Sequence, residues 1–188
     1  MTTQTEYETK ALDIDPAEMA QRIAAAGGTH VTDRVMRRYV YDIAPGDAGR
    51  WVRLRDTGSE VTLCVKEIIS DAVDGTRETE TTVGDFDTAN VLLGGLGFTA
   101  KAYQENRRSS WLLDEVRLEI DSWPLIPPYL EIEGDDAEQV WAAAKRLGLD
   151  HAALTSQNTT AVYARYGIDL NTIPDLRFPS ADARPSIT

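Results

Sequence analysis

The chain alternates between two periodicities of hydrophobic and polar residues. In four segments, apolar residues recur at the three- to four-residue spacing of an amphipathic helix. In eight others, apolar and polar residues alternate one by one, as in a strand with one buried face. The predicted helices are residues 16–26, 85–97, 135–147 and 159–166, and the predicted strands are residues 4–12, 34–43, 49–56, 60–68, 76–83, 100–112, 115–122 and 129–134. We therefore expect an α+β fold.

The boundaries of these elements carry recognisable signals. Asp15 followed by Pro16 is typical of a helix start, a capping side chain and then a first-turn proline. Asp135 is expected to cap the third helix, and Gly148 to end it. A length of 188 residues fits one domain, which we place at residues 1–172. Three prolines after residue 173 predict an irregular C-terminal tail, residues 173–188.

The polar faces of the strands hold ionisable side chains in register. Residues two apart on a strand share a face. The shared faces hold Glu6, Glu8 and Lys10; Trp51, Arg53 and Arg55; Cys64 and Lys66; Glu78 and Glu80; Arg117, Glu119 and Asp121; and Glu131 and Glu133. One interpretation is an ordinary antiparallel sheet with one solvated face. The other is a closed barrel with the charged face inward.

A charged interior has chemical consequences. Enclosed charges are tolerated only when they are paired with each other, with a metal or with a ligand. Arginine and lysine suit phosphate oxygens, and carboxylates suit hard cations such as Mg²⁺ or Mn²⁺. A closed barrel would therefore suit a polyanion chelated to a divalent metal.

Composition excludes several other classes of function. The 31 acidic and 19 basic residues give a formal charge of −12, which argues against general binding to nucleic acid or to an anionic membrane. Cys64 is the only cysteine, so neither an intrachain disulfide nor a thiolate zinc cluster can form. The N-terminus has no apolar signal-like stretch, and no apolar run reaches the length of a membrane span. We expect a cytoplasmic protein.

The order of these charges resembles a known family. Glu6-Tyr7-Glu8-Thr9-Lys10 matches the ExExK motif that opens the CYTH superfamily, the triphosphate tunnel metalloenzymes. The motif is followed in family order by Arg53 and Arg55, Lys66, Arg77 with Glu78 and Glu80, Lys101 with Arg107 and Arg108, Glu119 with Asp121, and Glu131 with Glu133. The resemblance covers residues 4–166. It implies eight antiparallel strands forming a tunnel, helices packed outside, and activity on triphosphates with Mg²⁺ or Mn²⁺.

The resemblance also implies roles for individual residues. The substrate would be bound by Lys10, Trp51, Arg53, Arg55, Lys66, Arg108 and Arg117, with Arg108 preferred to its neighbour Arg107. The metal would be held by Glu6, Glu8, Glu119, Asp121, Glu131 and Glu133, and Lys66, Glu78 and Glu80 would be catalytic. In thiamine triphosphatases an aromatic residue placed like Trp51 stacks on the organic part of the substrate, although Trp51 would equally serve to plug the barrel end. The region around Thr159 lacks a cation that many members carry.

The leading hypothesis is a metal-dependent triphosphatase that hydrolyses the terminal phosphate of inorganic triphosphate or a small organic triphosphate. One alternative is a class IV adenylyl cyclase, which converts ATP to cyclic AMP and pyrophosphate. A second is a non-catalytic module that binds polyphosphate or a nucleotide. The expected partner is a small-molecule triphosphate, not nucleic acid or a membrane, and the expected state is a monomer or homodimer.

Overall fold

A computed structural model describes residues 3–44 and 46–179 of the chain. Its main strands are β1 (Gln4–Ala11), β2 (Thr29–Asp42), β3 (Arg50–Asp56), β4 (Val61–Ile68), β5 (Thr76–Val83), β6 (Ala100–Leu113), β7 (Val116–Ser122) and β8 (Tyr129–Gly134). Its α-helices are α1 (Pro16–Ala25), α2 (Phe86–Gly95), α3 (Ala137–Arg146) and α4 (Thr159–Arg165). The shorter elements are the 3₁₀ turns η1 (His151–Ala153) and η2 (Leu170–Thr172) and the two-residue strands β9 (Leu154–Thr155) and β10 (Asp175–Leu176).

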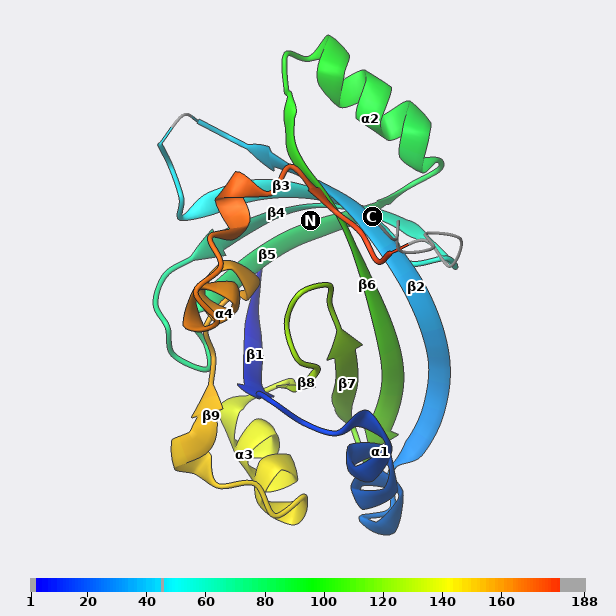
Figure 1. Cartoon of the computed structure of the whole chain (residues 1–188), viewed down its shortest axis with the longest axis vertical. Coiled ribbons are helices and arrows are strands. Elements are labelled where there is room, and N and C mark those ends of the chain that lie inside the picture. Colours follow the sequence, from blue (N-terminus) through cyan, green and yellow to red (C-terminus); the bar gives the residue numbers. More distant parts are fainter. Residues whose placement is uncertain (1–2, 45, 180–188) are drawn as a thin grey trace, which may run out of the picture.

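The eight long strands close into a barrel. Their order is β6-β2-β3-β4-β5-β1-β8-β7, and β7 pairs with β6 to complete the ring. All eight pairings within the ring are antiparallel. The helices lie outside it, with α2 at one end and α1 and α3 at the other (Figure 1). The predicted closed antiparallel barrel with external helices is confirmed.

The apolar cores lie on the outside of this barrel, between the strands and the helices. Val52 and Leu54 alternate with the charged residues of β3 and pack against Phe86 of α2. At the other end, Ile23 of α1 and Val140 of α3 cover the apolar face of β7 and β8. Burying these faces against helices turns the opposite, charged faces of the strands toward the barrel axis.

Many element boundaries differ from the prediction by one or two residues; the start of β2 and the cap of α3 differ for identifiable reasons. β2 begins at Thr29, five residues before the predicted start. The additional residues belong to the strand because they pair with residues 109–112 of β6. The cap of α3 is Asp136 and not Asp135; the Asp136 side chain accepts a hydrogen bond from the backbone N–H of Gln139. Two consecutive aspartates gave the pattern no means of choosing between them.

The start of the predicted irregular tail is partly ordered into a strand. Asp175 and Leu176 form β10, which runs parallel to β6. Leu176 is buried in an apolar cluster with Trp123 and Tyr163, and this contact anchors the segment in spite of its prolines. Residues 180–188 of the expected tail lie outside the described residues. No helix of the described chain is long and apolar enough to cross a membrane.

Candidate active site in the barrel cavity

The barrel encloses a cavity of about 1510 Å³. This exceeds the usual range of about 300–1,000 Å³ for small-molecule sites. All fifteen residues assigned from the sequence line it: Glu6, Glu8, Lys10, Trp51, Arg53, Arg55, Lys66, Glu78, Glu80, Arg108, Arg117, Glu119, Asp121, Glu131 and Glu133. The prediction that the charged faces converge on one enclosed space is therefore confirmed, whereas the role of each residue stays a prediction.

Lys10 is the most deeply buried cation, with 2% of its side chain exposed. Its Nζ lies 2.6 Å from Glu8 Oε1 and 3.4 Å from Glu131 Oε2, and Glu131 is its cross-strand neighbour on β8. Burial lowers the pKa of Lys10, but Glu8 and Glu131 outweigh that effect and the pKa ends above its usual value. Lys10 is therefore a permanent positive charge inside the cavity.

A second network joins β1, β3, β4 and β5. Lys66 Nζ lies 2.8 Å from Glu6 Oε2 and 3.2 Å from Glu78 Oε2. Arg53 Nη2 lies 2.7 Å from Glu78 Oε1 and 3.1 Å from Glu80 Oε2. Burial raises the pKa of Glu6, whereas the pKa of Glu78, although burial opposes the change, is lowered by Glu6, Arg53 and Lys66. The Glu6 carboxyl consequently holds its proton more firmly than Glu78.

A third network is centred on Arg108. Its Nη2 lies 2.6 Å from Asp121 Oδ2 and 3.2 Å from Glu131 Oε1, and its Nε donates to Asp121 Oδ1 at 2.8 Å. Asn106 donates a further hydrogen bond to Asp121. The neighbouring Arg107 is exposed and lies over Phe178, so of the two arginines Arg108 is the one that lines the cavity, and its role in binding phosphate stays a prediction.

Two of the assigned residues lie near the rim of the cavity. Arg117 leaves 59% of its side chain exposed and pairs with Glu133. Trp51 is half-buried at the start of β3, opposite Lys66 of β4. Polar uncharged residues of α4 and its cap, Asn158 and Thr159 among them, also line the cavity. Residues 156–160 supply no cation there, as the sequence indicated.

The carboxylates of β7 and β8 fit a divalent cation. Glu119 and Glu131 face each other in the β7–β8 register. Glu119 Oε2 is buried without a hydrogen-bond donor among the described residues, and burial raises the pKa of Glu119. An unsatisfied buried carboxylate oxygen next to a second carboxylate is the donor set that Mg²⁺ and Mn²⁺ prefer.

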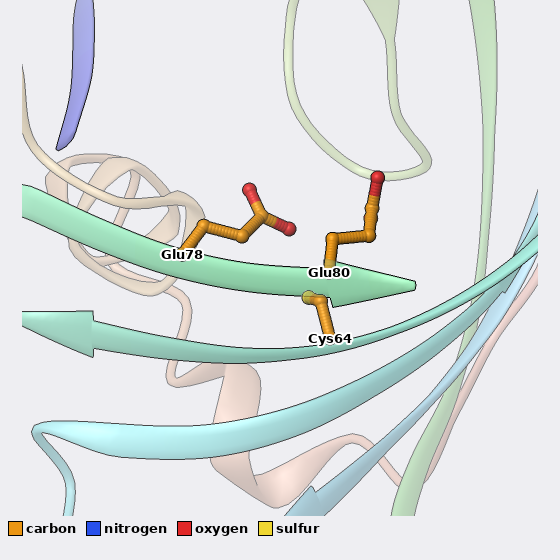
Figure 2. A group of neighbouring side chains, drawn as sticks. All are labelled: Cys64, Glu78 and Glu80. Atoms are coloured by element: carbon orange, nitrogen blue, oxygen red, sulfur yellow. The ribbon is translucent and has the colours of Figure 1, made fainter. Parts of the chain in front are cut away.

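A tighter acidic group lies on β4 and β5. Cys64, Glu78 and Glu80 place their ligand atoms within 4.8 Å of one another, the one such group of three found in the described chain. Figure 2 shows both glutamates projecting from the same side of β5. Burial raises the pKa of Cys64 to about 12, so the thiol stays protonated, and Arg53 already contacts both carboxylates. Arg108 likewise contacts Glu119 and Glu131, so what distinguishes that pair as a site for a hard cation is the unsatisfied Glu119 Oε2 and the absence of a protonated thiol beside it.

Arg38 is a cavity residue that the sequence pattern did not predict. It lies on β2 with 8% of its surface exposed and lines the cavity. Its guanidinium donates to Asn106 Oδ1 and lies 4.5 Å from the centre of the Trp123 ring. The available signal was that Arg34, Met36 and Arg38 are spaced two apart and so share one face of that strand. These residues belong to no recognised motif.

Comparison with known proteins agrees with this architecture. The CYTH domain model matches residues 4–162. A comparison with curated protein sequences found no match. Similar solved structures include a conserved hypothetical protein from Pyrococcus furiosus, at 22% identity and a TM-score of 0.70, with 82% of this chain and 98% of that chain covered.

Two further neighbours have descriptions that mention an activity. A protein from Vibrio parahaemolyticus described as a putative adenylate cyclase has 17% identity and a TM-score of 0.72, with 87% of this chain and 99% of that chain covered. A putative adenylyl cyclase from Hippeastrum, described as revealing a dominant triphosphatase activity, has 18% identity and a TM-score of 0.56, with 86% and 96% covered. These identities show a shared fold, and the family match extends over most of the residues that build the barrel. The chain belongs to the CYTH domain family.

Proposed function

We propose that this protein is a divalent-metal-dependent triphosphatase that hydrolyses the terminal phosphate of inorganic triphosphate or a small organic triphosphate. The observation that carries the proposal is the convergence of five buried or half-buried cations and a set of carboxylates on one enclosed cavity. The cations are Lys10, Arg53, Arg55, Lys66 and Arg108. The family match and the triphosphatase activity described for the Hippeastrum protein support the same reaction class.

The cations of the cavity bind and orient the phosphate chain. In the ligand-free protein, Lys10, Lys66 and Arg108 are neutralised by nearby carboxylates. Phosphate oxygens replace some of these partners when a triphosphate enters, because guanidinium groups bind them bidentately. The buried positions of the cations then fix the chain, and positioning with charge stabilisation supplies most of the rate enhancement for phosphoryl transfer.

Glu119 and Glu131 would hold Mg²⁺ or Mn²⁺, with Glu6, Glu8, Asp121 and Glu133 as the other predicted ligands. Bound there, the metal would neutralise phosphate oxygens. Lys66, Glu78 and Glu80 are the proposed catalytic residues: the carboxylates orient a water toward the terminal phosphorus, and Lys66 stabilises charge on the phosphate oxygens. The reaction proceeds by direct attack of water and needs no covalent intermediate.

The test is a product analysis with purified protein. The protein is incubated with Mg²⁺ or Mn²⁺ and, separately, inorganic triphosphate, thiamine triphosphate and ATP. Orthophosphate release that is abolished by a chelator is the expected result. Cyclic AMP with pyrophosphate would instead identify a cyclase, and tight binding without turnover would identify a binding module; either result would refute the proposal.

A further inference from the structure

Arg38 and Arg55 form a pair of like charges inside the barrel. They are directly opposite each other in the β2–β3 register, and both line the cavity. Like charges at directly opposed positions destabilise a sheet, and buried guanidinium groups add a desolvation cost. Such a pair persists in a folded protein when a ligand compensates the charge during function.

Arg53, Arg55, Arg108 and Arg117 have carboxylate partners in the cavity, but the buried Arg38 has none among the described residues. Within residues 3–44 and 46–179, its polar contact is Asn106, its stacking partner is Trp123, and its Nε has no hydrogen-bond acceptor. Arg55 has one distant partner, Glu80, at 3.4 Å, and its Nε also has no acceptor within those ranges. Burial and the neighbouring arginines lower the pKa of Arg38 to about 9 and that of Arg55 to about 10. Arg38 and Arg55 are therefore two facing, buried cations of the cavity with little ionic compensation.

The surroundings of Arg38 indicate which part of a ligand it would meet. Its guanidinium stacks on Trp123, which belongs to an apolar cluster with Tyr163 and Leu170 and offers no polar group of that cluster to a phosphate chain on this side. Trp51 lies four residues from Arg55 on the same strand, or about 13 Å away at the usual rise of a strand. An organic group at Trp51 and a terminal phosphate at Arg55 would thus be separated by about the length of a triphosphate chain and its ester group.

We propose that Arg38, together with Arg55, binds the unesterified terminal phosphate of the substrate. The proposal rests on the proposed triphosphatase function and adds a residue outside the family motif. A terminal phosphate is close to doubly charged at neutral pH, since its second pKa is about 6. It therefore matches two guanidinium groups, whereas an esterified, internal phosphate carries one charge. The site would favour substrates with a free phosphate end, such as inorganic triphosphate and nucleoside or thiamine triphosphates.

The experiment compares Arg38→Gln with Arg37→Gln, a matched control on the same strand. Arg37 points outward, pairs with Asp56 and stacks on Phe86. Binding of inorganic triphosphate is measured by titration calorimetry without metal. We expect Arg38→Gln to weaken binding about tenfold or more, because a hydrogen bond to a charged group contributes about 1.5–3 kcal/mol. Arg37→Gln should stay within about twofold of the wild type, as expected for a surface ion pair.

A second ligand tests the terminal-phosphate assignment. Diadenosine triphosphate has both ends esterified, so it should bind the wild type more weakly and lose little further affinity in Arg38→Gln. Equal losses for the two ligands would overturn the assignment. So would unchanged triphosphate affinity in Arg38→Gln.

Thermal unfolding of the ligand-free variants separates binding from packing. Removing an uncompensated buried charge should leave the midpoint of Arg38→Gln unchanged or raise it. A lower midpoint would assign Arg38 a structural role under Trp123 and overturn the proposal. Arg38→Lys keeps the positive charge but lacks the planar guanidinium that binds phosphate bidentately, so it should bind triphosphate with intermediate affinity.

Phosphate release by the wild type keeps the two proposals distinguishable. Hydrolysis with no effect of Arg38→Gln on binding would leave the proposed function standing and overturn this inference. Weakened triphosphate binding in Arg38→Gln with no hydrolysis by the wild type would support the role of Arg38 in binding and refute the proposed triphosphatase function.

Discussion

At the scale of single residues, the cavity is organised by buried ion pairs whose cations can also bind phosphate. Lys66 is 13% exposed and bridges two carboxylates, Glu6 and Glu78. Burial lowers its pKa, as does the nearby Arg53, but Glu6 and Glu78 outweigh both, so its pKa lies above the usual value. It therefore remains charged at neutral pH and is available to phosphate oxygens.

Replacing Lys66 by Gln should raise the KM for triphosphate and lower kcat, together reducing kcat/KM by about a hundredfold or more. The reason is the loss of a buried charge next to the phosphate chain. Steady-state phosphate release measures the effect. Arg77→Gln, an exposed residue on β5, is the control and should retain wild-type kinetics. Similar kinetics in the two variants would remove Lys66 from the site.

Cys64 gives a prediction about pH. Its side chain is buried and burial raises its pKa to about 12, whereas an unperturbed thiol has a pKa of about 8.5. The folded protein should therefore react with a thiol reagent at pH 8.5 far more slowly than the urea-unfolded protein. Above about pH 8.5 the unfolded chain loses the thiol proton before the folded protein does. The free energy of unfolding should therefore fall as the pH rises. Rapid labelling of the folded protein would contradict this.

At the scale of elements, the C-terminal segment supports the arginine end of the cavity. β10 pairs with β6 as a short parallel strand, and Leu176 packs into the cluster that contains Trp123. Trp123 in turn stacks on Arg38. The last described strand thus lies two contacts away from the proposed phosphate site.

Leu176→Ala should lower the free energy of unfolding by about 2–5 kcal/mol, the usual range for a large-to-small change in a core. Chemical denaturation followed by tryptophan fluorescence measures it. Leu96→Ala is the matched control, because Leu96 is 77% exposed and should change stability by less than about 0.5 kcal/mol. Equal effects of the two substitutions would show that the β10 contact is not part of the folded core.

The elements also show what a sequence can and cannot reveal. Strict alternation on β3, with Val52 and Leu54 against Arg53 and Arg55, identified both the strand and its cavity face. Ring closure depends on the pairings of β2 with β6 and of β1 with β5 and β8, which join segments distant in sequence and which periodicity does not report. Arg38 was missed for a related reason: its significance lies in facing Arg55 across two strands, and register is a tertiary property.

At the scale of the whole molecule, the chain is strongly acidic overall but carries uncompensated positive charge inside. The formal charge is −12, while Arg38 and Arg55 are short of ionic partners within the described part of the barrel. Binding of a polyanion relieves repulsion between these cations. Binding of a polyanion in the cavity should consequently stabilise the folded state more than nonspecific binding of anions to the surface does.

Inorganic triphosphate should raise the thermal unfolding midpoint in a concentration-dependent way, equivalent to about 2.7 kcal/mol at a hundred times its Kd. Differential scanning fluorimetry in a chelator measures the shift without turnover. Sulfate at matched ionic strength is the control, because it carries two charges on a single centre and cannot span the cavity. Equal shifts with both anions would indicate a general salt effect.

The position of β1 between β5 and β8 has a consequence for how the chain reaches this structure. β1 pairs with β5 on one edge and has its other edge paired only once β8, which ends at Gly134, is available. Contacts between residues so distant in sequence are formed late, because the entropy of closing long loops is lost before the contacts form. Folding of this domain should therefore be slow, with β1 left half-paired until β8 has been synthesised and has joined the sheet.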